Sequence, residues 1–152
     1  MTTEPAVIER ELHIDARPEI VFAYFTDPER MMRWMGTEAQ LDPRPGGGFR
    51  CKVTGDDVAV GEYVEVTRYS RIVFTWGWEG DNPVAPGSST IEVTLAEDGD
   101  GTLLRFVHRD LPAEAVGPHA DGWTHFLDRL AIAAAGGDPG PDPWVDSPPG
   151  GA

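Results

Sequence analysis

The feature that most restricts the fold is one long amphipathic helix that follows a run of strand-like segments. We expect this helix over residues 119–135, where apolar side chains recur at helical spacing and share one face. An aromatic strand is expected upstream, over residues 71–78, and its alternate side chains also share a face. Two such surfaces can bury each other, which predicts a sheet that grips a helix. The helix face carries Trp123, Phe126, Leu127, Leu130 and Ala134, and the strand face carries Ile72, Phe74, Trp76 and Trp78.

Several segments alternate between apolar and polar residues, as half-buried strands do. One strand precedes two short helices, which begin near Pro18 and Pro28, and six strands follow them. Tight turns between successive strands indicate hairpins and therefore an antiparallel sheet. The order β-α-α-β(6)-α predicts an α+β fold in which a curved sheet wraps around the C-terminal helix. The strand segments are residues 6–14, 37–42, 49–53, 58–67, 71–78, 89–95 and 102–109.

The C-terminal region contains two breaks in this pattern. Leu111-Pro112 can start a helical segment, and Gly117-Pro118 is expected to interrupt it before the main helix begins. Beyond the helix the chain is rich in Pro, Gly and Asp, a composition typical of disorder. We therefore expect one domain over residues 1–137 and a disordered tail over residues 138–152. The candidates for anchoring this tail are Trp144 and Val145.

Composition narrows the class of partner and the compartment. The 152-residue chain carries a formal net charge of −14 and scatters its 12 basic residues, which disfavours nucleic acid and anionic membranes. No apolar stretch reaches the roughly 20 residues that a membrane-spanning helix needs, so we expect no membrane insertion. The N-terminus lacks signal-peptide features, and Cys51 is a single cysteine, as in a reducing compartment. These observations predict a cytoplasmic protein, monomeric or homodimeric.

A set of short stretches between residues 6 and 135 forms a recognisable combination. The stretches are residues 16–22, 26–29 with Trp34, 45–49, 61–66, 72–76, 102–108, and 119–130 around Gly122-Trp123. In this order they resemble the helix-grip fold of the START-like, or SRPBCC, superfamily. Within it the chain is most similar to the branch named for the activator of the heat-shock protein 90 ATPase.

The resemblance implies a cavity between the long helix and the sheet. Members of the superfamily bind lipids, sterols, polyketides and other apolar molecules there, and some act as aromatases or cyclases. The branch shares no catalytic signature. The chain is also expected to lack the additional N-terminal domain of the eukaryotic co-chaperones, which weighs against a chaperone-activating role.

The bulky apolar residues have two possible roles, because they can either fill a core or line such a cavity. Five tryptophans are difficult to pack without voids, which favours a partly open cavity with aromatic walls. Such walls suit an apolar ligand that contains a ring. The residues expected to contact the ligand are Trp34, Phe49, Phe74, Trp76, Trp78, Phe106, His108, Trp123 and Leu127.

The polar candidates also have two interpretations each. His108 shares the inner strand face, where it could shuttle protons, or it could simply bond to a neighbouring group. Glu65 would be a buried, functional carboxylate if it faced the core. Alternation instead places Val64 and Val66 on the inner face and leaves Glu65 in solvent. His119 lies one helical turn before Trp123 and could stand at the mouth of the cavity.

No pattern indicates a metal or a cofactor. His119 and His125 are six residues apart and do not share a helix face, so they make a poor pair of metal ligands. Cys51 has neither a cysteine partner nor an evident base. The glycines of residues 46–48 lack the lysine and the spacing of a phosphate-binding or dinucleotide-binding loop.

Three functions are compatible with these residues. The first is non-catalytic binding of a small hydrophobic, lipid- or polyketide-like molecule. The second is a polyketide cyclase or aromatase that uses the same cavity, with His108 or Glu65 as acid or base. The third is a co-chaperone-like interaction module, which predicts a filled core and an exposed apolar patch.

Overall fold

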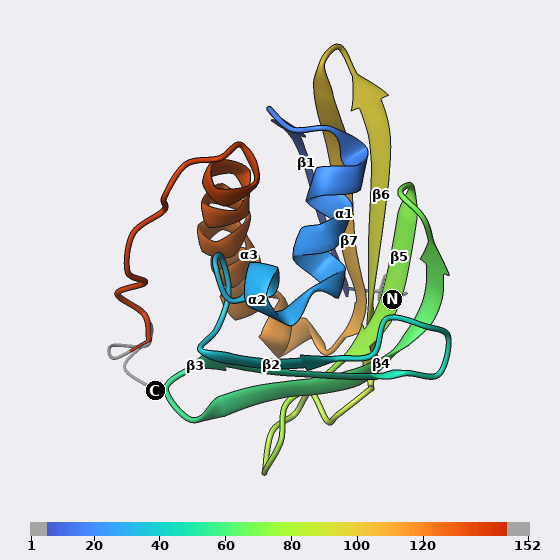
Figure 1. Ribbon diagram of the computed structural model, residues 1–152. Helices are drawn as coiled ribbons and strands as arrows, with labels where there is room; N and C mark the ends of the chain where they lie inside the picture. The colour runs from blue at the N-terminus through green and yellow to red at the C-terminus, as the bar shows by residue number, and fades with distance from the viewer. Residues whose placement is uncertain (1–5, 146–152) are drawn as a thin grey trace.

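The computed structural model describes residues 6–145, which form a seven-stranded antiparallel sheet curved around three helices (Figure 1). Its order is β1-β7-β6-β5-β4-β3-β2, so successive strands are neighbours except where β1 pairs with β7. This architecture confirms the expected α+β helix-grip fold and its order of elements. The strands are β1 (Ala6–Ile14), β2 (Glu38–Leu41), β3 (Gly48–Thr54), β4 (Asp57–Thr67), β5 (Arg71–Trp76), β6 (Ser89–Asp98) and β7 (Gly101–Leu111), and the helices are α1 (Pro18–Thr26), α2 (Pro28–Met31) and α3 (Ala113–Ala134).

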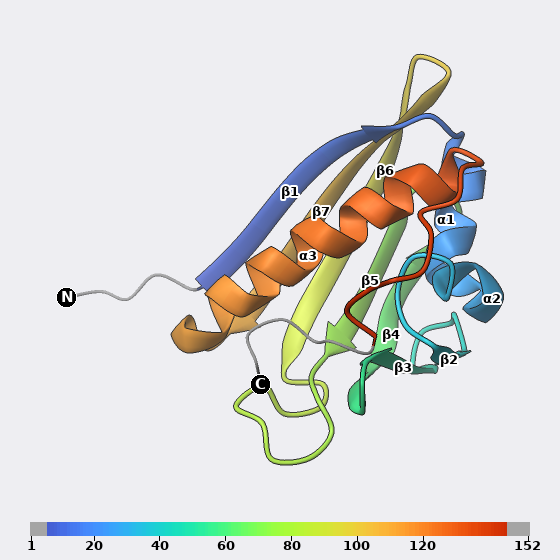
Figure 2. The same ribbon diagram turned by 90° about the vertical axis from the view of Figure 1, so that its left-hand side faces the viewer.

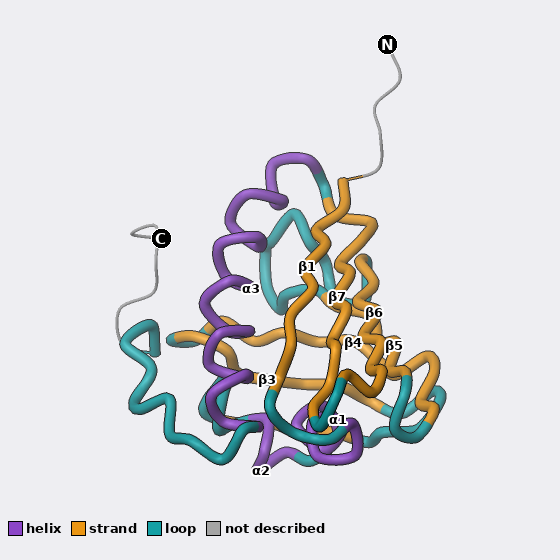
Figure 3. The backbone as a smooth tube through the Cα atoms, turned by 90° about the horizontal axis from the view of Figure 1, so that it is seen from above, coloured by secondary structure: helices purple, strands orange, loops and turns teal. Residues whose placement is uncertain are grey.

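The core lies between the concave face of the sheet and the helices, with α3 crossing that face (Figure 2). Alternation along each strand decides which side chains enter the core, and the antiparallel register sets which of them face each other across neighbouring strands. In the β6–β7 pair, Val93 stands opposite Phe106, and Ile91 stands opposite His108. All four side chains are buried. Viewed from above, β3 and β4 run across the direction of β1 and β7, so the sheet turns around the helices (Figure 3).

Strand β4 departs from the alternation expected of it. The register with β5 shifts between Tyr63 and Glu65, so one extra residue, Val64, lies between two paired positions. Tyr63 and Val66 consequently face the core, whereas Val64 is 52% exposed. The expectation that Val64 and Val66 share the inner face was therefore wrong for Val64, because the irregularity between them places these two residues on opposite faces of the strand.

Helix α3 also differs from the sequence-based expectation, since it begins at Ala113 and continues through Gly117 and Pro118. Proline at position 118 cannot donate a hydrogen bond to the carbonyl of residue 114. The imidazole of His119 supports the next turn, because its Nδ1 lies 2.8 Å from the Ala115 carbonyl oxygen. One 22-residue helix therefore continues where local propensity predicts a break, with a hydrogen bond from the His119 side chain to the preceding turn.

The segment of residues 138–145 returns along α3 towards β3 (Figure 2). The Arg129 guanidinium on α3 donates to the carbonyl oxygens of Pro139 and Gly140, at 3.3 and 3.0 Å. At its other end, the Gly55 amide donates to the Val145 carbonyl at 3.0 Å. Residues 138–145, which we call the strap, thus contact both α3 and the turn between β3 and β4. The rest of the expected tail, residues 146–152, lies outside the described residues.

None of the helices described between residues 6 and 145 is both long enough and apolar enough to span a membrane.

Candidate functional site

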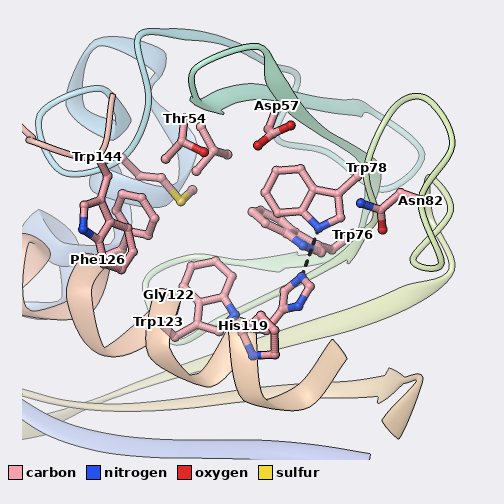
Figure 4. A pocket seen from close by; sticks show the side chains of 13 residues that line it. Thr54, Asp57, Trp76, Trp78, Asn82, His119, Gly122, Trp123, Phe126 and Trp144 are labelled. Atoms are coloured by element: carbon pink, nitrogen blue, oxygen red, sulfur yellow. Dashed lines mark hydrogen bonds between the residues drawn. The ribbon is translucent and has the colours of Figure 1, made fainter. Parts of the chain in front are cut away.

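A cavity of about 240 Å³ lies between the N-terminal half of α3, strands β3 to β5 and the strap (Figure 4). It is partly open to solvent and is mostly apolar. Its walls combine side chains that lie far apart in the sequence, because α3 crosses the sheet at the point where β5 ends. The lining residues are Met35, Val53, Thr54, Asp57, Trp76, Trp78, Asn82, Pro118, His119, Gly122, Trp123, Phe126 and Trp144.

Three tryptophans form the main aromatic wall of this cavity. Trp76 ends β5, Trp78 follows it and pairs with Ala59 of β4, and Trp123 projects from α3. The ring centroids of Trp76 and Trp78 are 5.3 Å apart at an interplanar angle of 81°, and those of Trp76 and Trp123 are 5.1 Å apart at 56°. These separations are typical of edge-to-face and tilted aromatic contacts. The indole rings therefore contact one another while still facing the cavity.

Gly77, which lies between Trp76 and Trp78, lets the following loop approach the end of β5 closely. A Cβ atom built at position 77 would lie 1.7 Å from the carbonyl oxygen of Ala85, a contact that no side chain permits. The close approach brings the 79–88 loop against the end of β5. The same loop is held by the Trp78 amide, which donates to the Val84 carbonyl at 2.8 Å.

A buried imidazole, His108, fixes the orientation of Trp123. The Trp123 indole Nε1–H donates to His108 Nδ1 at 3.0 Å, so this nitrogen carries no proton. His108 Nε2 then donates to Ser89 Oγ at 2.8 Å, and the Ser89 hydroxyl donates to the Trp76 carbonyl at 2.7 Å. Burial, with a smaller contribution from His119, lowers the pKa of His108 to about 3. His108 is therefore neutral at physiological pH.

A second neutral imidazole, His119, holds Trp78 in the same manner. The Trp78 indole Nε1–H donates to His119 Nε2 at 3.0 Å (Figure 4), while His119 Nδ1–H donates to the Ala115 carbonyl. Burial lowers the pKa of His119 below its ordinary value. Protonation of Nε2 would remove the acceptor that Trp78 uses, so the hydrogen bond also favours the neutral ring.

Trp76, the third tryptophan of this wall, differs from the other two in its hydrogen bonding. Trp76 Nε1 is buried and has no hydrogen-bond partner among residues 6–145. A buried donor without an acceptor costs about 1–3 kcal/mol. Trp76 is therefore the member of the wall that would gain most from an added acceptor.

The residues that the sequence nominated for ligand contact separate into two groups. Trp76, Trp78 and Trp123 line the cavity. The other side chains lie in the packed core behind it, where for example Phe49 stacks on Phe74 and Phe106 contacts Trp123, with ring centroids 4.7 and 4.6 Å apart. The members of this second group are Trp34, Phe49, Phe74, Phe106, His108 and Leu127.

Several lining residues were not among those expected from the sequence to contact a ligand. Phe126 belongs to the recognised apolar face of the helix, and His119 had been placed at the mouth of the cavity, so both had a signal in the sequence. Asp57 has no functional signal in the sequence. Trp144 had been recognised only as an anchor for the tail, yet it completes the wall by stacking on His125, at 3.7 Å and 11°.

Neither Glu65 nor Cys51 belongs to the cavity. Glu65 lies on the convex face of the sheet and forms an ion pair with Arg71 at 3.2 Å, in agreement with the expectation that it is solvated. Cys51 is fully buried, and burial raises the pKa of its thiol to about 12, so it is not nucleophilic. Within residues 6–145, no cluster of three His, Cys, Asp or Glu side chains could hold a metal ion.

Comparison with known proteins supports the fold and identifies the family. The family model described as "Activator of Hsp90 ATPase homolog 1-like protein" matches residues 15–135. The solution structure of the AHSA1-like protein RHE_CH02687 from Rhizobium etli is 49% identical, with a TM-score of 0.74, over 93% of this chain and 89% of that one. No curated protein sequence matches this chain.

Two further solved structures share the fold at lower identity. CalU16 from Micromonospora echinospora is 28% identical, with a TM-score of 0.68, over 90% of this chain and 88% of that one. An HSP90 activator from Plasmodium falciparum is 23% identical, with a TM-score of 0.71, over 84% and 95%. The family match over most of its length and the 49% identity to the Rhizobium etli protein show that the chain belongs to the family of activator of Hsp90 ATPase homolog 1-like proteins.

Proposed function

We propose that this protein binds a small hydrophobic molecule that contains a ring, in the cavity between the sheet and α3, without transforming it chemically. The observation that carries the proposal is the wall formed by the indoles of Trp76, Trp78 and Trp123 around a partly open, mostly apolar space. Flat aromatic surfaces with few polar groups favour a ring stacked against them. Hydrogen bonds from Trp78 and Trp123 to neutral imidazoles hold two of these surfaces in place before a ligand arrives.

The volume of the cavity limits both the size and the affinity of the ligand. A space of about 240 Å³ suits a molecule of one to three rings. Removing roughly 200 Å² of apolar surface from water contributes about 5 kcal/mol, and part of this is offset by the lost freedom of the ligand. We therefore expect a dissociation constant on the order of 1 mM for a simple aromatic compound. A natural ligand with additional polar contacts would bind more tightly.

The histidines and Glu65 are poorly placed to act as the acid or base of a cyclase. His108 and Glu65, the acid–base candidates of a cyclase, are not lining residues. His119 does line the cavity, but both of its ring nitrogens are already engaged, by Trp78 and by Ala115. General acid–base chemistry needs a group within hydrogen-bond reach of the substrate that can exchange a proton.

The interaction-module alternative receives less support from the described surface. That function predicts a filled core, whereas a cavity opens beside α3. The large exposed apolar side chains come from different elements, including Ile20 on α1, Val64 on β4 and Ile132 on α3. The likeness to the Plasmodium HSP90 activator is at an identity that extends to the fold alone.

A cavity-filling substitution tests the proposal directly. A Cβ atom at Gly122 meets nothing within 4 Å, so Gly122→Leu would extend a side chain into the cavity. The change should also favour the helix by about 1 kcal/mol, which separates loss of binding from loss of folding. We expect the emission of the neutral probe N-phenyl-1-naphthylamine to rise on binding to the wild type and to stay low with Gly122→Leu.

Thr124→Leu is the matched control, because Thr124 lies on the exposed side of the same helix. This variant should bind the probe as the wild type does. An unresponsive wild type, or a Gly122→Leu variant that binds normally, would overturn the proposed function.

A further inference from the structure

The cavity contains one charged side chain, and it is acidic. Asp57 begins β4 at the solvent-exposed rim of the cavity, and its carboxylate points towards the Trp78 ring (Figure 4). It forms no hydrogen bond or ion pair through its side chain with any described residue, unlike Asp56 next to it, which lies 3.9 Å from Lys52 Nζ. No lysine or arginine lines the cavity. The site therefore presents a negative charge that no neighbouring cation neutralises.

Because His119 is neutral, the Asp57 carboxylate stays the charged group among the residues that line the cavity. A protonated imidazole at this position would place a cation in the wall, opposite Asp57. Burial and the hydrogen bond from Trp78 both favour the unprotonated ring. The overall charge of −14 adds a long-range field of the same sign as Asp57.

The hydrogen bonds to the histidines also affect the indole faces. An indole whose N–H donates to an imidazole gains electron density in its ring, since hydrogen-bonded groups polarise one another in a poorly screened interior. Trp78 and Trp123 both donate in this way. Electron-rich aromatic faces attract cations, and tryptophan does so most strongly among the aromatic residues.

From these three observations we infer that the ligand of this cavity is cationic: a quaternary or protonated amine attached to a ring. The ring lies against the tryptophan wall, and the positive centre lies between the Asp57 carboxylate and the face of Trp78. This inference rests on the proposed function and adds the charge of the ligand to it.

An isosteric pair of probes separates charge from shape. Phenyltrimethylammonium and tert-butylbenzene have nearly the same shape, and only the first is charged. We expect the wild type to bind the ammonium probe at least as tightly as the neutral one, as followed by tryptophan emission. Asp57→Asn should weaken binding of the ammonium probe about three- to fivefold and leave binding of tert-butylbenzene unchanged.

Asp56→Asn is the matched control, because it removes the same charge from the adjacent residue, which does not line the cavity. It should leave the affinity for both probes unchanged. Asp57→Glu retains the carboxylate and should retain most of the ammonium affinity, so a fold defect at this turn cannot imitate the expected result.

The outcomes distinguish this inference from the function on which it rests. If the neutral probe binds more than about tenfold more tightly than its cationic isostere, or if Asp57→Asn leaves ammonium binding unchanged, the charge preference is overturned while the binding function remains. If neither probe binds the wild type, the proposed function itself fails.

Discussion

At the scale of single residues, the two histidines that bond to the tryptophan wall, buried His108 and partly buried His119, are structural parts of the site. His108 is 0% exposed, and each of its ring nitrogens has a partner. His119 is engaged through both nitrogens as well. Each imidazole accepts a hydrogen bond from an indole, which requires an unprotonated nitrogen. The tryptophan wall therefore depends on the protonation state of two residues that sequence reasoning had associated with proton transfer or with the cavity mouth.

This dependence predicts a loss of stability in mild acid. His108 has a pKa of about 3 in the folded protein against an ordinary value of 6.5, so the unfolded chain binds more protons between these values. Stability should therefore fall as the pH falls from 6.5, by about 2 kcal/mol at pH 5 from His108 alone. Urea denaturation at several pH values measures the change.

The variant His108→Gln removes the titrating group and should reduce this fall. His13 must be replaced in both proteins, because the hydrogen bonds that it donates to Asp98 and Asp15 raise its pKa and give it the opposite pH dependence. A His108→Gln protein with an unchanged slope between pH 6.5 and 5 would contradict the assignment.

The indole nitrogens predict unequal costs for two similar substitutions. Trp123→Phe leaves His108 Nδ1 buried without a donor, whereas Trp76→Phe removes an N–H that has no partner among the described residues. Both rings are nearly fully buried. Trp123→Phe should therefore destabilise the fold by about 1–2 kcal/mol more than Trp76→Phe. Equal urea midpoints for the two variants would argue against the hydrogen bond to His108.

At the scale of elements, the strap is the least expected part of the structure. Asp142 Oδ1 accepts from His125 Nε2 at 2.8 Å and from the Trp144 amide at 2.9 Å. Its side chain is 6% exposed, and its Oδ2 has no partner within residues 6–145. One buried carboxylate thus ties the strap to α3 and positions Trp144 over the cavity.

Removal of this carboxylate should release the strap. With Asp142→Ala, amide hydrogen exchange at Trp144 should accelerate, since its N–H loses its acceptor. Asp138→Ala is the control, because Asp138 accepts only from Gly140 near the start of the strap and is exposed. Equal exchange rates in the two variants would show that Asp142 does not hold the strap.

Helix α3 and strand β4 show where predictions from local sequence fail. Gly117 and Pro118 predict a break in a helix, yet α3 runs through them because the sheet face and the His119–Ala115 contact support it. Alternation would place Val64 and Val66 on one face of β4, but the register shift between Tyr63 and Glu65 places them on opposite faces. Hydrophobic periodicity and helix propensity signal neither feature, since each depends on how side chains and strands pair in the folded protein.

At the scale of the whole molecule, element order and family were predictable from the sequence, and the composition of the cavity was predictable only in part. Periodicity identifies each strand and the long helix, so the helix-grip fold follows from element order together with the family resemblance. The cavity depends on which aromatic residues remain at the end of the sheet. Trp34 and Trp76 have similar sequence signals, but only Trp76 lies where α3 leaves space. Asp57 and Trp144 enter the site through tertiary proximity alone.

The close packing of angled indoles has an optical consequence. Trp76 lies about 5 Å from both Trp78 and Trp123, at 81° and 56°, and neighbouring chromophores at such angles couple electronically. The circular dichroism of the folded protein should therefore contain an exciton signal from these pairs. A ligand that turned any of the three rings would alter its sign or size, so the protein would report occupancy of its own cavity without a label.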